Sequence, residues 1–211
     1  VRKFRQKYYD HFSKIYDRFV ALHSFDRQGS LRNYLSEKTG TQKGGKVLDI
    51  CTGTASLLKH LQKKTGEDGI VVGVDFSRGM LGIAREKTAS TDHVFLVQAD
   101  VSHMPFKARI FDAVTCAHAF YELQGKAQDQ SLREIGRLLK PGKPFLMLEH
   151  DVPNHPLIRM LFYVRLLSMG PSRAMEILKH ERELLARHFT SVNKIKTPTG
   201  RSQIMICKNA Y

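Results

Sequence analysis

The stretch from residue 47 to residue 61 constrains the fold more than any other part of the chain. A short apolar run over 47–50 contains Asp49 and leads into small residues around Gly53, and leucines with helical spacing follow at 57–61. This pattern predicts a strand, a tight loop and a helix. Small side chains in such a loop let the backbone come close to a bound ligand.

A second apolar run, over 70–74, ends in Asp75 about twenty residues after Gly53. An acid at that place can accept hydrogen bonds from a ribose diol. Together the two runs indicate a nucleoside-type cofactor at the carboxyl ends of parallel strands. The dinucleotide fingerprint G-x-G-x-x-G is not met, because Cys51 and Ala55 flank Gly53.

Predicted strands and helices alternate along the rest of the chain. We expect strands at 47–50, 70–74, 94–98, 111–116, 143–149, 192–196 and 203–207, and helices at 2–39, 56–65, 80–89, 126–139, 156–169 and 172–188. Alternating strands and helices form a parallel sheet covered on both faces. The fold class expected is therefore α/β, with a doubly wound, mostly parallel seven-stranded sheet.

The net charge of +14 over 211 residues is placed unevenly. Residues 1–46 hold 11 Lys or Arg against 4 Asp or Glu, residues 47–152 hold 13 of each kind, and residues 153–211 hold 10 against 3. The centre is neutral and each flank carries +7. Basic flanks attract nucleic acid phosphates, anionic lipid headgroups or acidic substrates, although ordinary solubility charge is an equally simple explanation.

Cysteine usage and hydropathy bear on the cellular compartment. The three cysteines are far apart in sequence and form no C-x-x-C pair, which favours reduced thiols with no disulfide framework and no metal. The chain has no apolar run of about 18 residues and no visible signal peptide. We therefore expect a cytoplasmic protein, with peripheral contact to the inner face of a membrane as a further option.

Five short motifs, in order along the chain, resemble those of the class I S-adenosylmethionine (SAM) methyltransferases. They are Asp-Ile-Cys-Thr-Gly-Thr-Ala at 49–55, Gly-Val-Asp-Phe-Ser-Arg-Gly-Met-Leu at 73–81, Gln-Ala-Asp-Val at 98–101 before Met-Pro-Phe at 104–106, Phe-Asp-Ala-Val at 111–114, and Leu-Leu-Lys-Pro-Gly at 138–142. The first resembles the family loop D/E-x-G-x-G-x-G, with Cys51 and Ala55 at two of its three glycine positions. The resemblance implies a Rossmann-like domain that binds SAM.

Residues 12–19 resemble the ubiquinone/menaquinone-biosynthesis (UbiE-type) group of that superfamily. In that group a Tyr-Asp pair sits on a helix that closes over the cofactor. The resemblance implies an N-terminal helical lid over 1–45, carrying Tyr16, and a SAM-binding methyltransferase domain over 46–211. An aromatic residue on an ordinary amphipathic helix is the alternative for Tyr16.

The resemblance also implies roles for individual residues. The loop would pass the methionine part of SAM, Asp49 would reach its amino group and Asp75 its ribose hydroxyls. The side chains after the second and third strands would contact the adenine, although a turn acid or ordinary core packing could explain them as well. The expected cofactor-binding residues are Tyr16, Asp49, Cys51, Thr52, Gly53, Asp75, Phe76, Met80, Asp100, Val101, Cys116 and Ala117.

The acceptor is expected just after the fourth strand. His118 is the first candidate for removing a proton from the acceptor, because histidine titrates near neutrality, and Tyr121 is a second catalytic candidate. Glu122 and His150 are weaker candidates, and a purely structural histidine is the alternative. The Arg-Asn pair that quinone methyltransferases usually carry here is absent, so the resemblance does not identify the acceptor.

Three functions remain open at this point. The first is methyl transfer to a small lipophilic acceptor such as a quinone precursor; the second is methylation of a phospholipid headgroup amine. The third is a non-catalytic SAM-fold protein that binds polyanions through its basic flanks.

The apolar segment 156–167, with Arg159 and Arg165, suits a substrate lid or a membrane surface, or packs on the sheet edge. Nucleic acid is a less favoured substrate, because no Pro-Pro-aromatic or Pro-Cys motif follows the fourth strand. The oligomeric state is not predicted.

Overall fold

A computed structural model describes residues 29–123, 125–151, 160, 181–198, 200 and 202–209. Most of the expected helices at 2–39, 156–169 and 172–188 lie outside these residues, and so does Tyr16. The predicted lid therefore stays a prediction.

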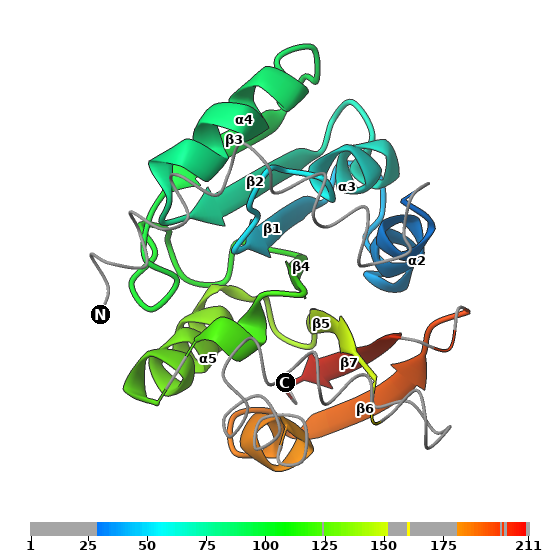
Figure 1. Ribbon diagram of the computed structural model, residues 1–211, viewed down its shortest axis with the longest axis vertical. Helices are drawn as coiled ribbons and strands as arrows, with labels where there is room; N and C mark the ends of the chain where they lie inside the picture. The colour runs from blue at the N-terminus through cyan, green and yellow to red at the C-terminus, as the bar shows by residue number, and fades with distance from the viewer. Residues whose placement is uncertain are drawn as a thin grey trace.

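The described residues form a seven-stranded sheet in the order β3-β2-β1-β4-β5-β7-β6 (Figure 1). The first five strands pair in parallel, whereas β7 is antiparallel to both β5 and β6. The strands are β1 Lys46–Ile50, β2 Ile70–Asp75, β3 Val94–Gln98, β4 Ala113–Ala117, β5 Pro144–His150, β6 Ser191–Lys196 and β7 Ser202–Lys208. This confirms the α/β, mostly parallel seven-stranded fold expected from the sequence.

Helices cover both faces of the sheet. They are α2 Ser30–Lys38, α3 Leu58–Thr65, α4 Arg78–Thr88 and α5 Lys126–Leu138, with a short 3₁₀ helix, η1, at Phe120–Glu122. One apolar cluster joins α2, α3 and α4 to the sheet through residues such as Leu35, Leu61 and Ala84. The other joins α5 and the residues after 181 to the opposite face.

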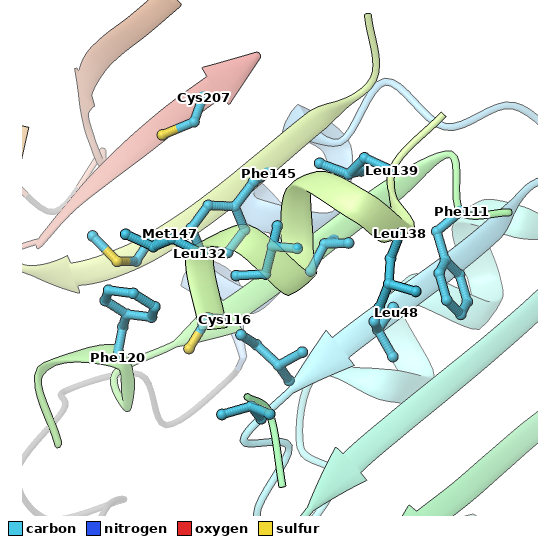
Figure 2. Close-up of a cluster of buried hydrophobic side chains, with 14 of the residues drawn as sticks. Leu48, Phe111, Cys116, Phe120, Leu132, Leu138, Leu139, Phe145, Met147 and Cys207 are labelled. Atoms are coloured by element: carbon cyan, nitrogen blue, oxygen red, sulfur yellow. The ribbon is translucent and has the colours of Figure 1, made fainter. Parts of the chain in front are cut away.

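The second cluster is the larger one and lies between α5 and the central strands. Phe120, Phe145 and Phe189 follow one another in it, with ring centroids 6.0 and 5.9 Å apart. Figure 2 shows Phe120 and Cys116 in this cluster, close to Met147 of β5. The core therefore extends to the carboxyl end of β4.

Three predicted starts were wrong by two residues each, and one of them is the helix expected from Met80, which begins at Arg78 directly after its N-cap Ser77. The helix expected from residue 56 begins at Leu58, because residues 51–57 form turns rather than helix. The strand expected from Phe111 begins at Ala113, since Phe111 forms only an isolated bridge to Leu139.

The strand order places β1 between β2 and β4, so the chain winds outward in opposite directions from these two central neighbours. In open α/β sheets a ligand binds outside the carboxyl ends of the strands at this reversal point. Among the described residues, no helix has the length and apolarity needed to cross a membrane.

Candidate functional site

Every second residue of the loop after β1 has a left-handed backbone conformation. Cys51, Gly53 and Ala55 have φ angles of 53°, 55° and 63°. These residues stand at the three glycine positions of the family loop D/E-x-G-x-G-x-G. Left-handed φ is the conformation for which glycine is suited, and an L residue there is strained by about 1–2 kcal/mol. The loop keeps the glycine geometry although two of its residues have side chains.

Asp75, at the end of β2, holds this loop in place. Its Oδ2 accepts the N–H of Gly53 at 2.9 Å, and its Oδ1 accepts the N–H of Ser77 at the start of α4, also at 2.9 Å. The side chain is 5% exposed, and burial raises the pKa of this carboxyl. Each carboxylate oxygen accepts more than one hydrogen bond, so Asp75 retains capacity for the hydroxyls of a ligand.

Asp49, near the end of β1, is 2% exposed. Its two oxygens accept hydrogen bonds from the hydroxyls of Thr52 and Thr115, each at 2.7 Å. Burial raises the pKa of Asp49 to about 7, while the two threonines and the positive charge of Arg32 on α2 act in the opposite direction. A cationic group placed beside this carboxyl would favour its ionised form.

The residues expected at the adenine surround the start of α4 and the turn after β3. Phe76 is half-buried, whereas Met80 and Val101 are buried among core side chains. Asp100 accepts the N–H of Ser102 at 3.0 Å and so caps the turn that follows β3. Asp100 thus has the structural role, an acid that fixes a turn, that was the alternative to adenine binding. Contact of Phe76, Met80, Asp100 and Val101 with a cofactor stays a prediction.

The carboxyl end of β4 brings two cysteines together. Cys116 is fully buried, and its thiol is hydrogen-bonded to that of Cys51, an interaction that with burial raises the pKa of Cys116 well above its usual value. The β1–β4 register aligns Cys116 with Ile50, directly before Cys51. Two of the cysteines therefore meet in the structure, although they are far apart in sequence.

The chain turns sharply after β4. Ala117 is half-buried, and His118 has a φ of 53° while its backbone N–H donates to the carbonyl of Leu148 on β5 at 2.8 Å. Tyr121 follows in η1 and is half-buried. Both catalytic candidates thus lie on one turn, at the same edge of the sheet as the loop after β1.

An open hollow of about 480 Å³ lies elsewhere, beside Lys59 and His93. His93 precedes β3 and Glu67, which also lines the hollow, precedes β2. The hollow is therefore at the amino ends of the strands and is not part of the candidate site.

Comparison with known proteins shows what family this arrangement belongs to. The model of the ubiE/COQ5 methyltransferase family matches residues 2–180. The chain belongs to this family. Demethylmenaquinone methyltransferases from several Staphylococcus aureus strains, Newman and COL among them, are 35% identical to it over 154 residues, which is 73% of this chain and 63% of theirs. The match thus spans less than two thirds of these relatives.

Solved structures support the fold of this methyltransferase family member. A SAM-dependent methyltransferase from Aquifex aeolicus superposes with a TM-score of 0.69 at 20% identity, covering 87% of this chain and 94% of that one. An O-methyltransferase family protein from Burkholderia thailandensis superposes with a TM-score of 0.69 at 14% identity, covering 96% and 59%. The likeness confirms the Rossmann-like methyltransferase fold expected from the sequence motifs.

Two further residues of the candidate site were not predicted from the sequence. Thr115 holds Asp49 from the neighbouring strand, and Glu149 accepts a hydrogen bond from the turn that carries Tyr121. Thr115 carries no local signal, because its partner lies 66 residues away. Glu149 does carry one: an acid that ends an otherwise apolar predicted strand is an unusual core residue.

Proposed function

We propose that this chain transfers a methyl group from SAM to a small lipophilic acceptor, a reduced quinone precursor. The observation that carries the proposal is the set of carboxyls around the left-handed loop at the reversal point of the sheet. Asp49 and Asp75 lie at the carboxyl ends of β1 and β2, Asp100 follows β3, and these three strands are neighbours in the sheet. Membership of the ubiE/COQ5 methyltransferase family supports the reaction class.

The donor set of these residues fits SAM. The cofactor carries a cationic amino group, a cationic sulfonium and a ribose diol, and carboxylates complement all three. Asp49 would hold the amino group and Asp75 the diol, while the loop around Gly53 would pass the methionine part. SAM supplies an electrophilic methyl group on its sulfonium sulfur.

The turn after β4 would hold the acceptor. A hydroquinol becomes a strong nucleophile when it loses a hydroxyl proton, so a base near that hydroxyl speeds methyl transfer. A ring nitrogen of His118 is the proposed proton acceptor, and Tyr121 is proposed to orient the acceptor ring. Apart from this, the protein acts by aligning the reactants and excluding water.

The names of the Staphylococcus aureus relatives favour a quinone precursor as the acceptor. A phospholipid headgroup amine is the competing acceptor, and a non-catalytic protein that binds polyanions is the competing function. Three retained carboxyls at the cofactor positions argue against the non-catalytic alternative, since a polyanion binder has no need of them.

Calorimetric titration with SAM and S-adenosylhomocysteine tests the cofactor site. We expect micromolar binding by the wild type, and a loss of affinity of about a hundredfold in Asp75→Ala, since two hydrogen bonds to a charged group are removed. Asp92→Ala, at an exposed position near the other end of the sheet, is the matched control. Folded wild-type protein that binds neither compound would overturn the proposal.

A methyl-transfer assay tests the acceptor. Short-chain demethylmenaquinol in detergent and vesicles containing phosphatidylethanolamine are offered with radiolabelled SAM. Label on the quinol, reduced at least about tenfold in His118→Ala, is the expected result. Label on lipid amine alone would replace the quinol by the headgroup acceptor, and label on neither would favour the non-catalytic alternative.

A further inference from the structure

A cluster of buried acids lies directly behind the turn that carries the acceptor candidates, and the proposed function does not use it. Glu149 at the carboxyl end of β5 is 4% exposed, and Glu181 is 5% exposed. The β5–β7 register aligns Glu149 with Gln203, whose Nε2 donates to Glu181 Oε2 at 2.6 Å. Three polar side chains thus meet at the end of an otherwise apolar core.

Glu149 holds the turn after β4. Its Oε1 accepts the N–H of Phe120 at 3.1 Å, and the N–H of Tyr121 is also hydrogen-bonded to its carboxyl. These two residues open η1, and the first N–H groups of a helix have no partner within it. The carboxyl of Glu149 therefore ties the start of η1 to β5.

Fixing the turn with Glu149 costs folding free energy, because the carboxyl is buried near other acceptor groups. Burial, and then the nearby carboxylate of Glu181, raise the pKa of Glu149 well above its usual value. Burial also raises the pKa of Glu181 to about 7. Gln203 adds an acceptor, because its Oε1 is buried without a hydrogen-bond partner among the described residues. A carboxyl buried near a second carboxyl and an unpaired amide oxygen destabilises the fold, and an apolar residue at this position would avoid that cost.

A turn that served only to connect elements would not need this arrangement. Only part of η1 is buried: Tyr121 and Glu122 are half-buried, whereas Phe120 packs in the core against Phe145. Rigid placement of Phe120 and of the backbone at Tyr121 thus sets where the half-buried side chains lie at the carboxyl edge of the sheet.

We infer that Glu149 is a positioning residue for the methyl acceptor: through its hydrogen bonds to the N–H groups of Phe120 and Tyr121 it fixes η1 and so the acceptor-facing side chain of Tyr121. This inference rests on the proposed function. It predicts that the length of the side chain at 149, which sets the position of the accepting oxygen, matters more than its charge.

Two variants separate length from charge. Glu149→Gln keeps the chain length and an acceptor oxygen, and we expect its KM for the quinol to stay within about threefold of the wild type. Glu149→Asp keeps the charge but withdraws the oxygen by one methylene, and we expect its KM for the quinol to rise about tenfold. The dissociation constant for SAM should change less than about twofold in both. Glu181→Gln, which alters the cluster without touching η1, is the matched control.

Hydrogen exchange gives a second readout that does not need turnover. The amides of Phe120 and Tyr121 should lose protection in Glu149→Asp and keep it in Glu149→Gln. An unchanged quinol KM in a Glu149→Asp protein that methylates quinol would overturn the inference alone, as would parallel losses of quinol and SAM affinity. Absence of quinol methylation by the wild type would overturn the proposed function, and the inference with it.

Discussion

Backbone strain at the candidate site falls on single residues with left-handed φ angles, His118 after β4 and two residues in the loop after β1. Ala55 has a φ of 63° and is buried, and Cys51 has a φ of 53°. A small side chain tolerates this region, whereas a β-branched one clashes with its own backbone there. The loop can therefore do without glycine at two positions but not without small residues.

Substitution at Ala55 tests this explanation. Ala55→Val should lower the free energy of unfolding by at least about 2 kcal/mol and weaken SAM binding, because valine is a genuine outlier in the left-handed region. Ala55→Gly, measured by the same urea titrations, should stay within about 1 kcal/mol of the wild type, since the relief of strain offsets the lost methyl. Equal losses in both variants would show that volume rather than backbone conformation limits this site.

The buried carboxyl of Asp49 predicts a pH dependence of stability. Its pKa is raised from 3.8 to about 7, so between these pH values the folded protein binds more protons than the unfolded chain, and stability falls as pH rises. Asp49→Asn removes this effect and keeps an oxygen that accepts from threonine.

Urea titrations of both proteins at about pH 5 and about pH 8 check the prediction. The variant should gain about 2–3 kcal/mol relative to the wild type between the lower and the higher pH. Comparison of the two proteins cancels the effect of the overall positive charge. If their stabilities changed in parallel with pH, Asp49 would not be the group that titrates.

At the scale of elements, an N-cap fixes the start of α4 at the carboxyl edge of the sheet. Ser77 lies just before the helix in extended conformation, and its Oγ accepts the N–H of Met80 at 3.2 Å. Asp75, two residues earlier, accepts the N–H of Ser77 itself. The start of α4 is thus tied to the carboxyl that is proposed to hold the ribose.

Ser77→Ala should therefore cost about 1 kcal/mol in stability, the usual value of a lost N-cap. We also expect SAM to bind a few-fold more weakly, since the N–H at position 77, which donates to Asp75, is then held less firmly. Ser90→Ala, at an exposed serine beyond the end of the same helix, should change stability by less than about 0.5 kcal/mol. Thermal unfolding and calorimetry measure the two effects, and an unaffected Ser77→Ala protein would contradict the capping role.

At the scale of the whole molecule, charge is separated between the centre and the two flanks. Residues 47–152, which include the strands β2 to β5 and all of β1 but its first residue, are neutral, while each flank carries +7. A lipophilic acceptor is held in a membrane, and basic segments near an anionic surface gain about 1 kcal/mol per Lys or Arg. We propose that the flanks bring the chain to such a surface.

Vesicle sedimentation tests whether the chain binds an anionic membrane surface. The protein should bind vesicles containing phosphatidylglycerol at about 50 mM salt and be released at about 500 mM, because salt screens the attraction. Vesicles of phosphatidylcholine alone are the control and should bind little at either concentration. Binding to both lipids without a salt effect would point to apolar insertion instead.

Local patterns in the sequence determined the elements and the family. Apolar runs, the glycine loop and the acids at or just after the ends of the first three strands depend on neighbouring residues, and Asp49, Asp75 and Asp100 lie at the predicted edge of the sheet. Only the tertiary structure decided which distant residues meet: Thr115 beside Asp49, Cys116 beside Cys51, and Glu181 near Glu149 through Gln203. These contacts depend on strand order and register, which join residues far apart in the chain. The depth of burial follows from the same packing, and it raises the pKa of Asp49 and Glu149, which no local pattern specifies.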